Sequence, residues 1–328
     1  MRHLRGIPSR LSCDPGYLAA AALPLIGIAL AYWSDGLIRA ADSAIHLHRL
    51  YAMQLLYRQG VFWPRWVSYF HLGYGYPIFN FYPPLAYHLG AILGLLGIGA
   101  PVAFNLIMAG AWIGGSVGTY ALARTFLPGS SAILAALLWT YAPSRLFEVW
   151  NQGSLAQTVG AALIPWLLLG LVRAARHPTP RALVGVAVPA AALAMTHLPL
   201  TIMTALFAVP LALLLTLWHA RRHPRAWPRH LLRLAGAGLL AAGLAAIFIL
   251  PVAGELRYVQ ARDQDPVPEL RNNFLELRDL LRQPTPLDLT DAQFLILPTL
   301  GLSWVWFALV GMAGLVWRRW YGAALLLA

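Results

Sequence analysis

Residues 198–218 have the sequence LPLTIMTALFAVPLALLLTLW, a run without a single charged residue. About 20 apolar residues in a helix are enough to cross the roughly 30 Å hydrocarbon layer of a membrane. Similar apolar segments recur along the whole chain, at residues 16–33, 83–99, 102–122, 132–142, 155–171, 182–196, 234–251 and 294–317. They are evenly apolar and lack the short alternating pattern of a membrane β-barrel. We therefore predict an all-α, polytopic transmembrane helix bundle.

The composition excludes a soluble protein. Of the 328 residues, 59% are hydrophobic and only 11% are charged, whereas a soluble domain has about 25% charged residues. The net charge of +12 would suggest nucleic acid as a partner of a soluble protein. Here most basic residues lie at the ends of apolar segments, as the positive-inside rule predicts, so we expect the lipid bilayer and no nucleic acid as a partner. Cys13 is the only cysteine, which excludes an internal disulfide and a cysteine metal cluster.

Charge also assigns the two sides of the membrane. Basic residues precede the first apolar segment, so we predict a cytoplasmic N-terminus in a multi-pass protein of the cell inner (plasma) membrane. Basic connections at 173–181, 219–233 and 318–319 should also be cytoplasmic. Four apolar segments lie between the first polar stretch, which is external, and residue 173. Four crossings that start outside would end outside, although the basic connection 173–181 should be cytoplasmic. One segment must not cross, and residues 83–99 are the weakest because they are short and begin with two prolines.

We therefore expect residues 83–99 to lie along the membrane or to re-enter it from the outer side. The other segments give about eight to nine spans in a single transmembrane domain over residues 1–328. The chain stops just as a last apolar segment begins, so we expect a C-terminal truncation. Three polar segments then share the outer face, at residues 34–81, 144–154 and 254–291.

Charged residues of the outer segments are the candidates for chemistry. None of the 12 acidic residues falls in the middle of a predicted span, which disfavours a proton-coupled transporter. In the first outer segment we expect a helix from Asp42 or Ser43 to about Gly60. Asp42, His46 and Arg49 share one face of it and could serve as a general base, a metal ligand or an anion clamp. The alternative is the polar face of an interfacial helix, with Asp42 merely capping its N-terminus.

Many aromatic side chains follow this helix, between residues 62 and 82. They could anchor the chain at the membrane interface, or form a stacking platform for a sugar or an isoprenoid chain. In the second outer segment Arg145 and Glu148 are three residues apart and could form a plain surface ion pair or face the site. The candidate substrate-binding residues are Asp35, Arg49, Arg65, Trp66, Tyr74, Tyr76, Tyr82, Arg145 and Glu148. The sequence contains no phosphate-binding P-loop, dinucleotide fingerprint or HExxH motif.

Three stretches resemble a known family: residues 42–46 (DSAIH), 60–66 (GVFWPRW) and 73–85 (GYGYPIFNFYPPL). They are similar to the bacterial membrane proteins named "6-pyruvoyl-tetrahydropterin synthase-related", although nothing in the chain resembles a soluble pterin enzyme. Those proteins look like distant members of the GT-C superfamily of integral-membrane glycosyltransferases. The resemblance implies a GT-C-like fold, with a cytoplasmic N-terminus and a long first outer loop that carries membrane-lying helices and an acidic residue near the first span.

The same resemblance implies a sugar donor linked to polyprenyl phosphate on the outer face, while the acceptor stays unknown. Asp42 would be the catalytic base or a metal-binding acid, with His46 beside it, and arginines of the outer loops would hold the carrier phosphate. No cofactor is implied with certainty, but Asp42 and His46 could bind a divalent metal. GT-C members often have a second acid in the second outer loop, where this chain offers Glu148 and has Gln157 at the expected place. Three functions stay open: a glycosyltransferase, a non-catalytic membrane component, and a transporter or lipid flippase.

Overall fold

The computed structural model describes residues 14–32, 40–222 and 227–259, together with residue 225 and a few single positions beyond residue 277. Within these ranges all regular secondary structure is helical, apart from one antiparallel bridge between Val67 and Tyr76. This confirms the predicted all-α class. Asp35 and most of the predicted outer segment 254–291 lie outside the described residues, and so does most of the predicted span 294–317.

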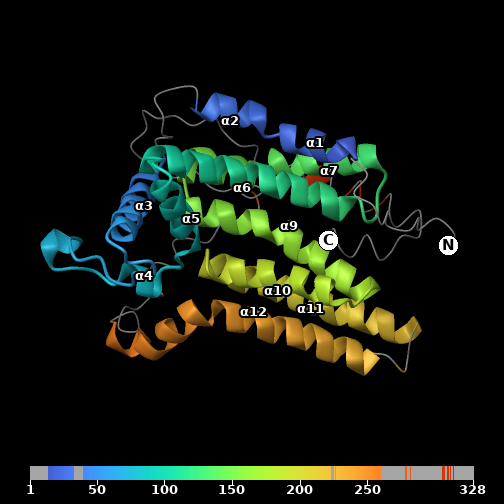
Figure 1. Ribbon diagram of the computed structural model, residues 1–328. Coiled ribbons are helices and arrows are strands. Elements are labelled where there is room, and N and C mark those ends of the chain that lie inside the picture. The colour runs from blue at the N-terminus through green and yellow to red at the C-terminus, as the bar shows by residue number, and fades with distance from the viewer. Residues whose placement is uncertain are drawn as a thin grey trace.

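The bundle helices lie side by side in Figure 1 and have the bounds α1 (Pro15–Ala22), α2 (Leu25–Tyr32), α6 (Ala100–Ala123), α7 (Gly129–Thr140), α9 (Leu155–Arg176), α10 (Pro180–Ala194), α11 (Leu198–Arg222) and α12 (Trp227–Glu255). Packing joins α6 to α1, α7 and α9, then α9 to α10, and α10 to α12, while α11 contacts α9 and α12. One end of the bundle carries α3 (Ser43–Arg58), α4 (Ile78–Phe81) and α5 (Leu85–Leu95), as Figure 1 shows. The short helix α8 (Pro143–Leu146) follows α7 in the chain.

Among the described residues, four helices are long and apolar enough to cross a membrane: Ala100–Ala123, Leu155–Arg176, Leu198–Trp218 and Trp227–Tyr258. Each coincides with a predicted span. Three further predicted spans coincide with the shorter apolar helices Pro15–Leu30, Gly129–Thr140 and Pro180–Ala194. The membrane class is therefore confirmed, while the full count of about eight to nine spans stays a prediction.

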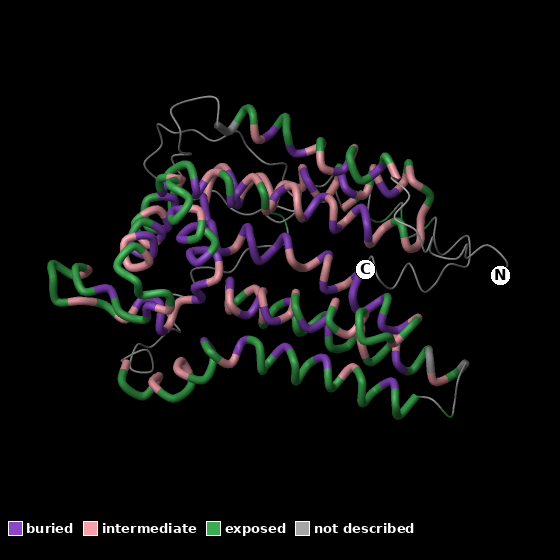
Figure 2. Tube along the Cα trace, viewed as in Figure 1, coloured by how far each residue is buried: buried purple, intermediate pink, exposed green. Residues whose placement is uncertain are grey.

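The outward faces of α11 and α12 carry large apolar side chains. Phe207 and Leu239 expose 75% and 74% of their surface, and Figure 2 marks much of α12 as exposed. Apolar surface of this extent is stable against lipid, whereas in water it would drive association. The inward face of α12 is built from small residues, since Ala241 and Ala245 are buried against alanines of α10. Small residues let membrane helices approach closely without a hydrophobic driving force between them.

Helices α3 and α5 run across the direction of the bundle helices (Figure 1). With 11 residues, α5 is about 16 Å long, roughly half the hydrocarbon thickness. It packs closely on α3, since Gly90 has no side chain and an added Cβ there would collide with the Leu50 side chain. Gln54 of α3 secures this contact by donating Nε2 to the Gly90 carbonyl oxygen at 2.9 Å. The 11-residue length agrees with a segment that does not cross the membrane, and its position along the membrane or re-entering it from the outer side stays a prediction.

Candidate functional site

The start of α3 is tied to the second outer segment, which is distant in sequence. The backbone N–H of Ala41 donates to the carbonyl oxygen of Asn151 at 3.0 Å. The N–H of Asp42 donates to the carbonyl oxygen of Gln152 at 2.7 Å. Both acceptors belong to a π-helical turn, Phe147–Gln152, that follows α8. Two segments that the sequence separately predicts on the outer face are therefore in contact at this point.

Gly153 allows this close approach. Its φ of 63° lies in the left-handed region, which side chains other than glycine rarely adopt. An added Cβ would collide with the Ser43 side chain and would lie 2.8 Å from the Cβ of Ala40. Glycine at position 153 therefore sets both the turn into α9 and the distance between the two outer segments.

Asp42 occupies the N-cap position of α3, but its side chain makes no capping hydrogen bond. The capping hydrogen bond expected in the alternative interpretation is therefore absent, while the interfacial position of the helix stays a prediction. No residue within the described ranges forms an ion pair with its half-buried carboxylate. The carboxylate is thus available, in the described part of the chain, to accept a proton or a hydrogen bond.

His46 lies one helical turn further along α3 and is buried, with 2% of its surface exposed. Its Nδ1 is 2.6 Å from the Tyr87 hydroxyl of α5, and its Nε2 is 3.3 Å from the Ser154 hydroxyl at the start of α9. Burial, helped by the positive charge of Arg49, lowers the pKa of His46 to about 3, so the ring is neutral near pH 7. A buried neutral ring with both nitrogens held joins three helices. This geometry favours a positioning role over the catalytic role expected from the sequence.

Tyr82, the residue directly after α4, contacts two residues of the predicted face of α3. The Arg49 guanidinium lies 4.2 Å from the centre of the Tyr82 ring, a cation–π contact. The His46 ring meets the same ring edge-on at 6.2 Å. Desolvation raises the pKa of Tyr82, while nearby Arg49 lowers it and nearby Asp42 raises it. Two of the three residues predicted to share one helix face, His46 and Arg49, thus contact a single tyrosine.

Glu148 and Arg145 form the predicted ion pair, but the pair is buried and does not lie on the surface. Arg145 Nη2 lies 2.6 Å from Glu148 Oε1, and the two side chains are 17% and 5% exposed. Gln157 of α9, at the place where a second acid was expected, donates Nε2 to the same oxygen at 3.0 Å. Burial raises the pKa of Glu148 to about 7, although the positive charge of Arg145 acts to lower it. Its other oxygen, Oε2, is buried without a partner among the described residues.

Arg65 is engaged elsewhere. Its Nη1 lies 2.9 Å from Oε1 of Glu255, the last residue of α12. Asn80 of α4 donates Nδ2 to the other oxygen of Glu255, also at 2.9 Å. This contact joins the first outer segment to the far edge of the bundle, and it gives Arg65 a protein carboxylate as its partner.

Trp66, Tyr74 and Tyr76 lie on the segment between α3 and α4, which projects from the end of the bundle (Figure 1). Tyr74 exposes 87% of its surface at the tip. Of the aromatic residues predicted to bind substrate, Tyr82 is the one in contact with the α3 face. The role of the other three stays a prediction.

The site residues do not fit a metal ion well. Throughout the described ranges, no three His, Cys, Asp or Glu side chains lie close enough to share one. Both nitrogens of His46 already have protein partners, which leaves Asp42 alone of the two expected ligands. We therefore derive no step of a reaction through a metal.

Sequence reasoning missed Tyr87 and Ser154, the residues that hold His46. Tyr87 lies in an apolar segment. A tyrosine hydroxyl that is buried there needs a hydrogen-bond partner, and this requirement is the signal that could have pointed to Tyr87. Ser154 has no comparable signal, because its contact with His46 spans 108 positions of sequence.

A family model described as "6-pyruvoyl-tetrahydropterin synthase related domain; membrane protein" matches residues 79–284. The chain belongs to this family. The family resemblance predicted from the sequence is thereby confirmed. No curated protein matches the chain, and no solved structure matches it either.

Membership of the 6-pyruvoyl-tetrahydropterin synthase related family covers only part of the site. Tyr82, Arg145 and Glu148 fall within the matched residues 79–284. Asp42 and His46 precede them, so the case for these two residues rests on the geometry described above.

Proposed function

We propose that this member of the family transfers a sugar from a polyprenyl-phosphate carrier to an acceptor on the outer face of the membrane. The observation that carries the proposal is the carboxylate of Asp42, which makes no capping hydrogen bond. Backbone hydrogen bonds of Ala41 and Asp42 hold this residue at the junction of two outer segments. The contacts of buried His46 with Tyr87 and Ser154 hold α3 in place one turn further along. A base that is held in position and has no partner of its own is what proton abstraction from an acceptor requires.

In this reaction Asp42 accepts the proton of the acceptor hydroxyl as the acceptor oxygen attacks the anomeric carbon of the sugar. The bond between that carbon and the carrier phosphate breaks, and polyprenyl phosphate leaves with the bonding electrons. Arg49 is the cation best placed to stabilise the leaving phosphate, because it stacks on Tyr82 and, among the described residues, forms no ion pair. The apolar surface of the bundle would accommodate the polyprenyl chain.

Glu148 and Arg145 hold the second outer segment in this reaction and do not transfer the proton. The pair is buried, and Gln157 occupies the same carboxylate oxygen from α9. Through the carbonyl oxygens of Asn151 and Gln152, the turn that carries Glu148 then fixes the start of α3.

The test uses the full-length protein in lipid nanodiscs with a panel of polyprenyl-phospho-sugars, and it measures release of polyprenyl phosphate. Wild type should release it from at least one donor, and Asp42→Asn should reduce the rate by about 10²- to 10⁴-fold. Asp14→Asn is the control, because it removes a carboxylate at the start of α1, away from the site. A wild type that releases nothing from any donor would contradict the proposal. It would favour a non-catalytic membrane component, or a transporter or lipid flippase.

A further inference from the structure

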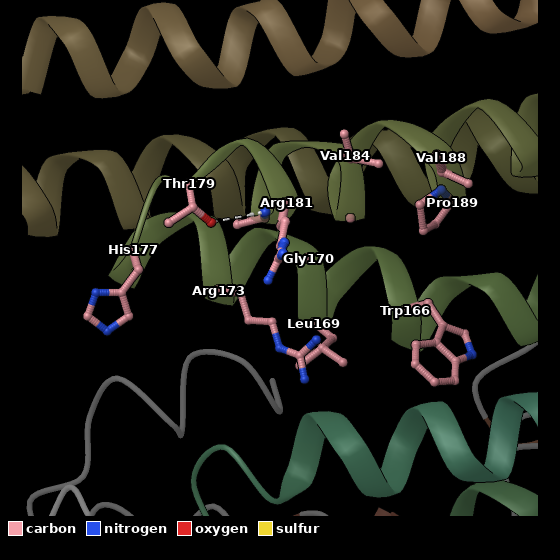
Figure 3. A pocket seen from close by; sticks show the side chains of 12 residues that line it. Trp166, Leu169, Gly170, Arg173, His177, Thr179, Arg181, Val184, Val188 and Pro189 are labelled. Carbon is pink, nitrogen blue, oxygen red and sulfur yellow. Dashed lines mark hydrogen bonds between the residues drawn. The ribbon is translucent and has the colours of Figure 1, made fainter. Parts of the chain in front are cut away.

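A groove of about 590 Å³ lies between α9 and α10, at the end of the bundle opposite to α3 (Figures 1 and 3). Its two walls meet where Gly170 of α9 packs against Gly185 of α10. An added Cβ on Gly170 would collide with the Gly185 backbone, so this close contact requires glycine. The groove has no part in the site described above, whose residues lie at the other end of α9.

The groove is apolar along its length and cationic at its mouth. Figure 3 shows Trp166, Val188 and Pro189 at one end, and Arg173, His177 and Arg181 at the other. Seven residues of helix separate Trp166 from Arg173, a rise of about 10 Å. The indole of Trp166 is fixed, because its Nε1 donates to the Gly114 carbonyl oxygen of α6 at 2.9 Å.

The positive charge at the mouth is not neutralised by any described residue. The ion pairs of the described ranges involve Arg65, Arg124 and Arg145, and neither Arg173 nor Arg181 takes part in one. Among the described residues, no acidic side chain lines the groove. The 15-residue helix α10 begins at this mouth, so its N-terminus adds a partial positive charge. The mouth therefore has a net positive potential with a choice of guanidinium donors.

We propose that this groove binds an anionic phospholipid of the inner leaflet. The phosphate would lie between Arg173 and Arg181, and an acyl chain would run along the groove towards Trp166. The connection 173–181 is one of the three basic connections that the charge pattern predicts to be cytoplasmic, which would place the mouth at the level of the inner headgroups. Basic pockets between helices on this side of a membrane are suited to anionic headgroups. A free phosphate ion would leave the apolar length of the groove without an occupant.

The experiment titrates phosphatidylglycerol and phosphatidylcholine onto the delipidated full-length protein and counts bound lipids by native mass spectrometry. Wild type should bind phosphatidylglycerol at least about tenfold more tightly than phosphatidylcholine. The double variant Arg173→Gln/Arg181→Gln should lose this preference. The matched control Arg221→Gln/Arg225→Gln removes the same charge from exposed arginines of the next basic connection and should keep the preference. Equal loss in both double variants, or no preference in wild type, would overturn the proposal.

A second variant separates a lipid from a free anion. Val188→Trp fills the apolar end of the groove and leaves both arginines in place, so it should weaken phosphatidylglycerol binding while the thermal unfolding midpoint stays close to wild type. Inorganic phosphate at millimolar concentration should compete only weakly. Unchanged lipid binding in Val188→Trp, together with full competition by phosphate, would show an anion site and refute the lipid proposal.

Discussion

The first and second outer segments each contribute one carboxylate to the site, and the surroundings of these two carboxylates differ. The first segment leaves Asp42 half-buried and without a partner among the described residues. The second segment buries Glu148 and gives it Arg145 and Gln157 as partners. An unpaired carboxylate can exchange a proton with a substrate, whereas a paired and buried one fixes the backbone around it. The difference assigns chemistry to the first segment and support to the second.

The sharpest test of this contrast compares Asp42→Asn with Glu148→Gln in the sugar-transfer assay. Asp42→Asn should lower the rate by about 10²- to 10⁴-fold with little loss of stability, because the Asp42 side chain makes no capping hydrogen bond that the change could remove. Glu148→Gln should lower the rate far less and should act mainly on stability. Equal losses of rate in two well-folded variants would break the division of roles.

The support role of the second segment predicts a large loss of stability in Arg145→Ala. At a pH well above 7, where the carboxylate is ionised, this change leaves Glu148 buried without its countercharge, and breaking a buried pair in this way costs about 3–5 kcal/mol. The free energy of unfolding in mixed micelles would measure the loss. The double variant Arg145→Ala/Glu148→Gln should recover part of it, since no buried charge then lacks a partner. A single variant as stable as wild type would mean that the pair does not hold the turn.

Gly153→Ala tests the junction between the two segments. An L-residue in the left-handed region costs about 1–2 kcal/mol, and here the added methyl group also collides with Ser43. Gly60→Ala is the matched control, because Gly60 has a φ of 83° but no atom within 4 Å of an added Cβ. Gly153→Ala should therefore destabilise the protein more than Gly60→Ala does. Equal effects would show that Ser43 moves aside and that the junction is loose.

The sequence was sufficient for the parts of the fold that depend on composition and spacing. Apolar runs predicted the long helices, and the helix expected from Asp42 or Ser43 to about Gly60 is α3, Ser43–Arg58. The helical spacing of Asp42, His46 and Arg49 predicts that they share one face, and the last two contact the same residue. This residue, Tyr82, was one of many aromatic candidates that spacing could not separate.

The sequence was insufficient where a residue's role depends on distant partners. His46 is a residue type that is common in catalysis. Only its contacts with Tyr87 and Ser154, which are 41 and 108 positions away in sequence, show that it is held in place. Glu148 was open to a surface or a site role because an i, i+3 spacing is the same in both. Its burial follows from the packing of α9 against the π-helical turn, which no local pattern predicts.

The smallest effect expected in wild type is a pH dependence in which two buried groups oppose each other. The pKa of Glu148 rises from 4.5 to about 7 on folding, so its contribution to stability is complete below pH 4.5 and is lost as the pH rises towards 7. The pKa of His46 falls from 6.5 to about 3, so its contribution is complete above pH 6.5 and is lost as the pH falls.

Between pH 4.5 and 6.5 the slopes of Glu148 and His46 have opposite signs, each at most about 1.4 kcal/mol per pH unit, and they nearly cancel in wild type. Glu148→Gln removes the falling slope, so its stability relative to wild type should increase with pH across this window. His46→Gln removes the rising slope and should show the reverse. Unfolding measured at several pH values checks both variants. If the Glu148→Gln curve ran parallel to that of wild type, Glu148 would titrate as an exposed carboxylate does, and the contrast between the two outer segments would lose its electrostatic basis.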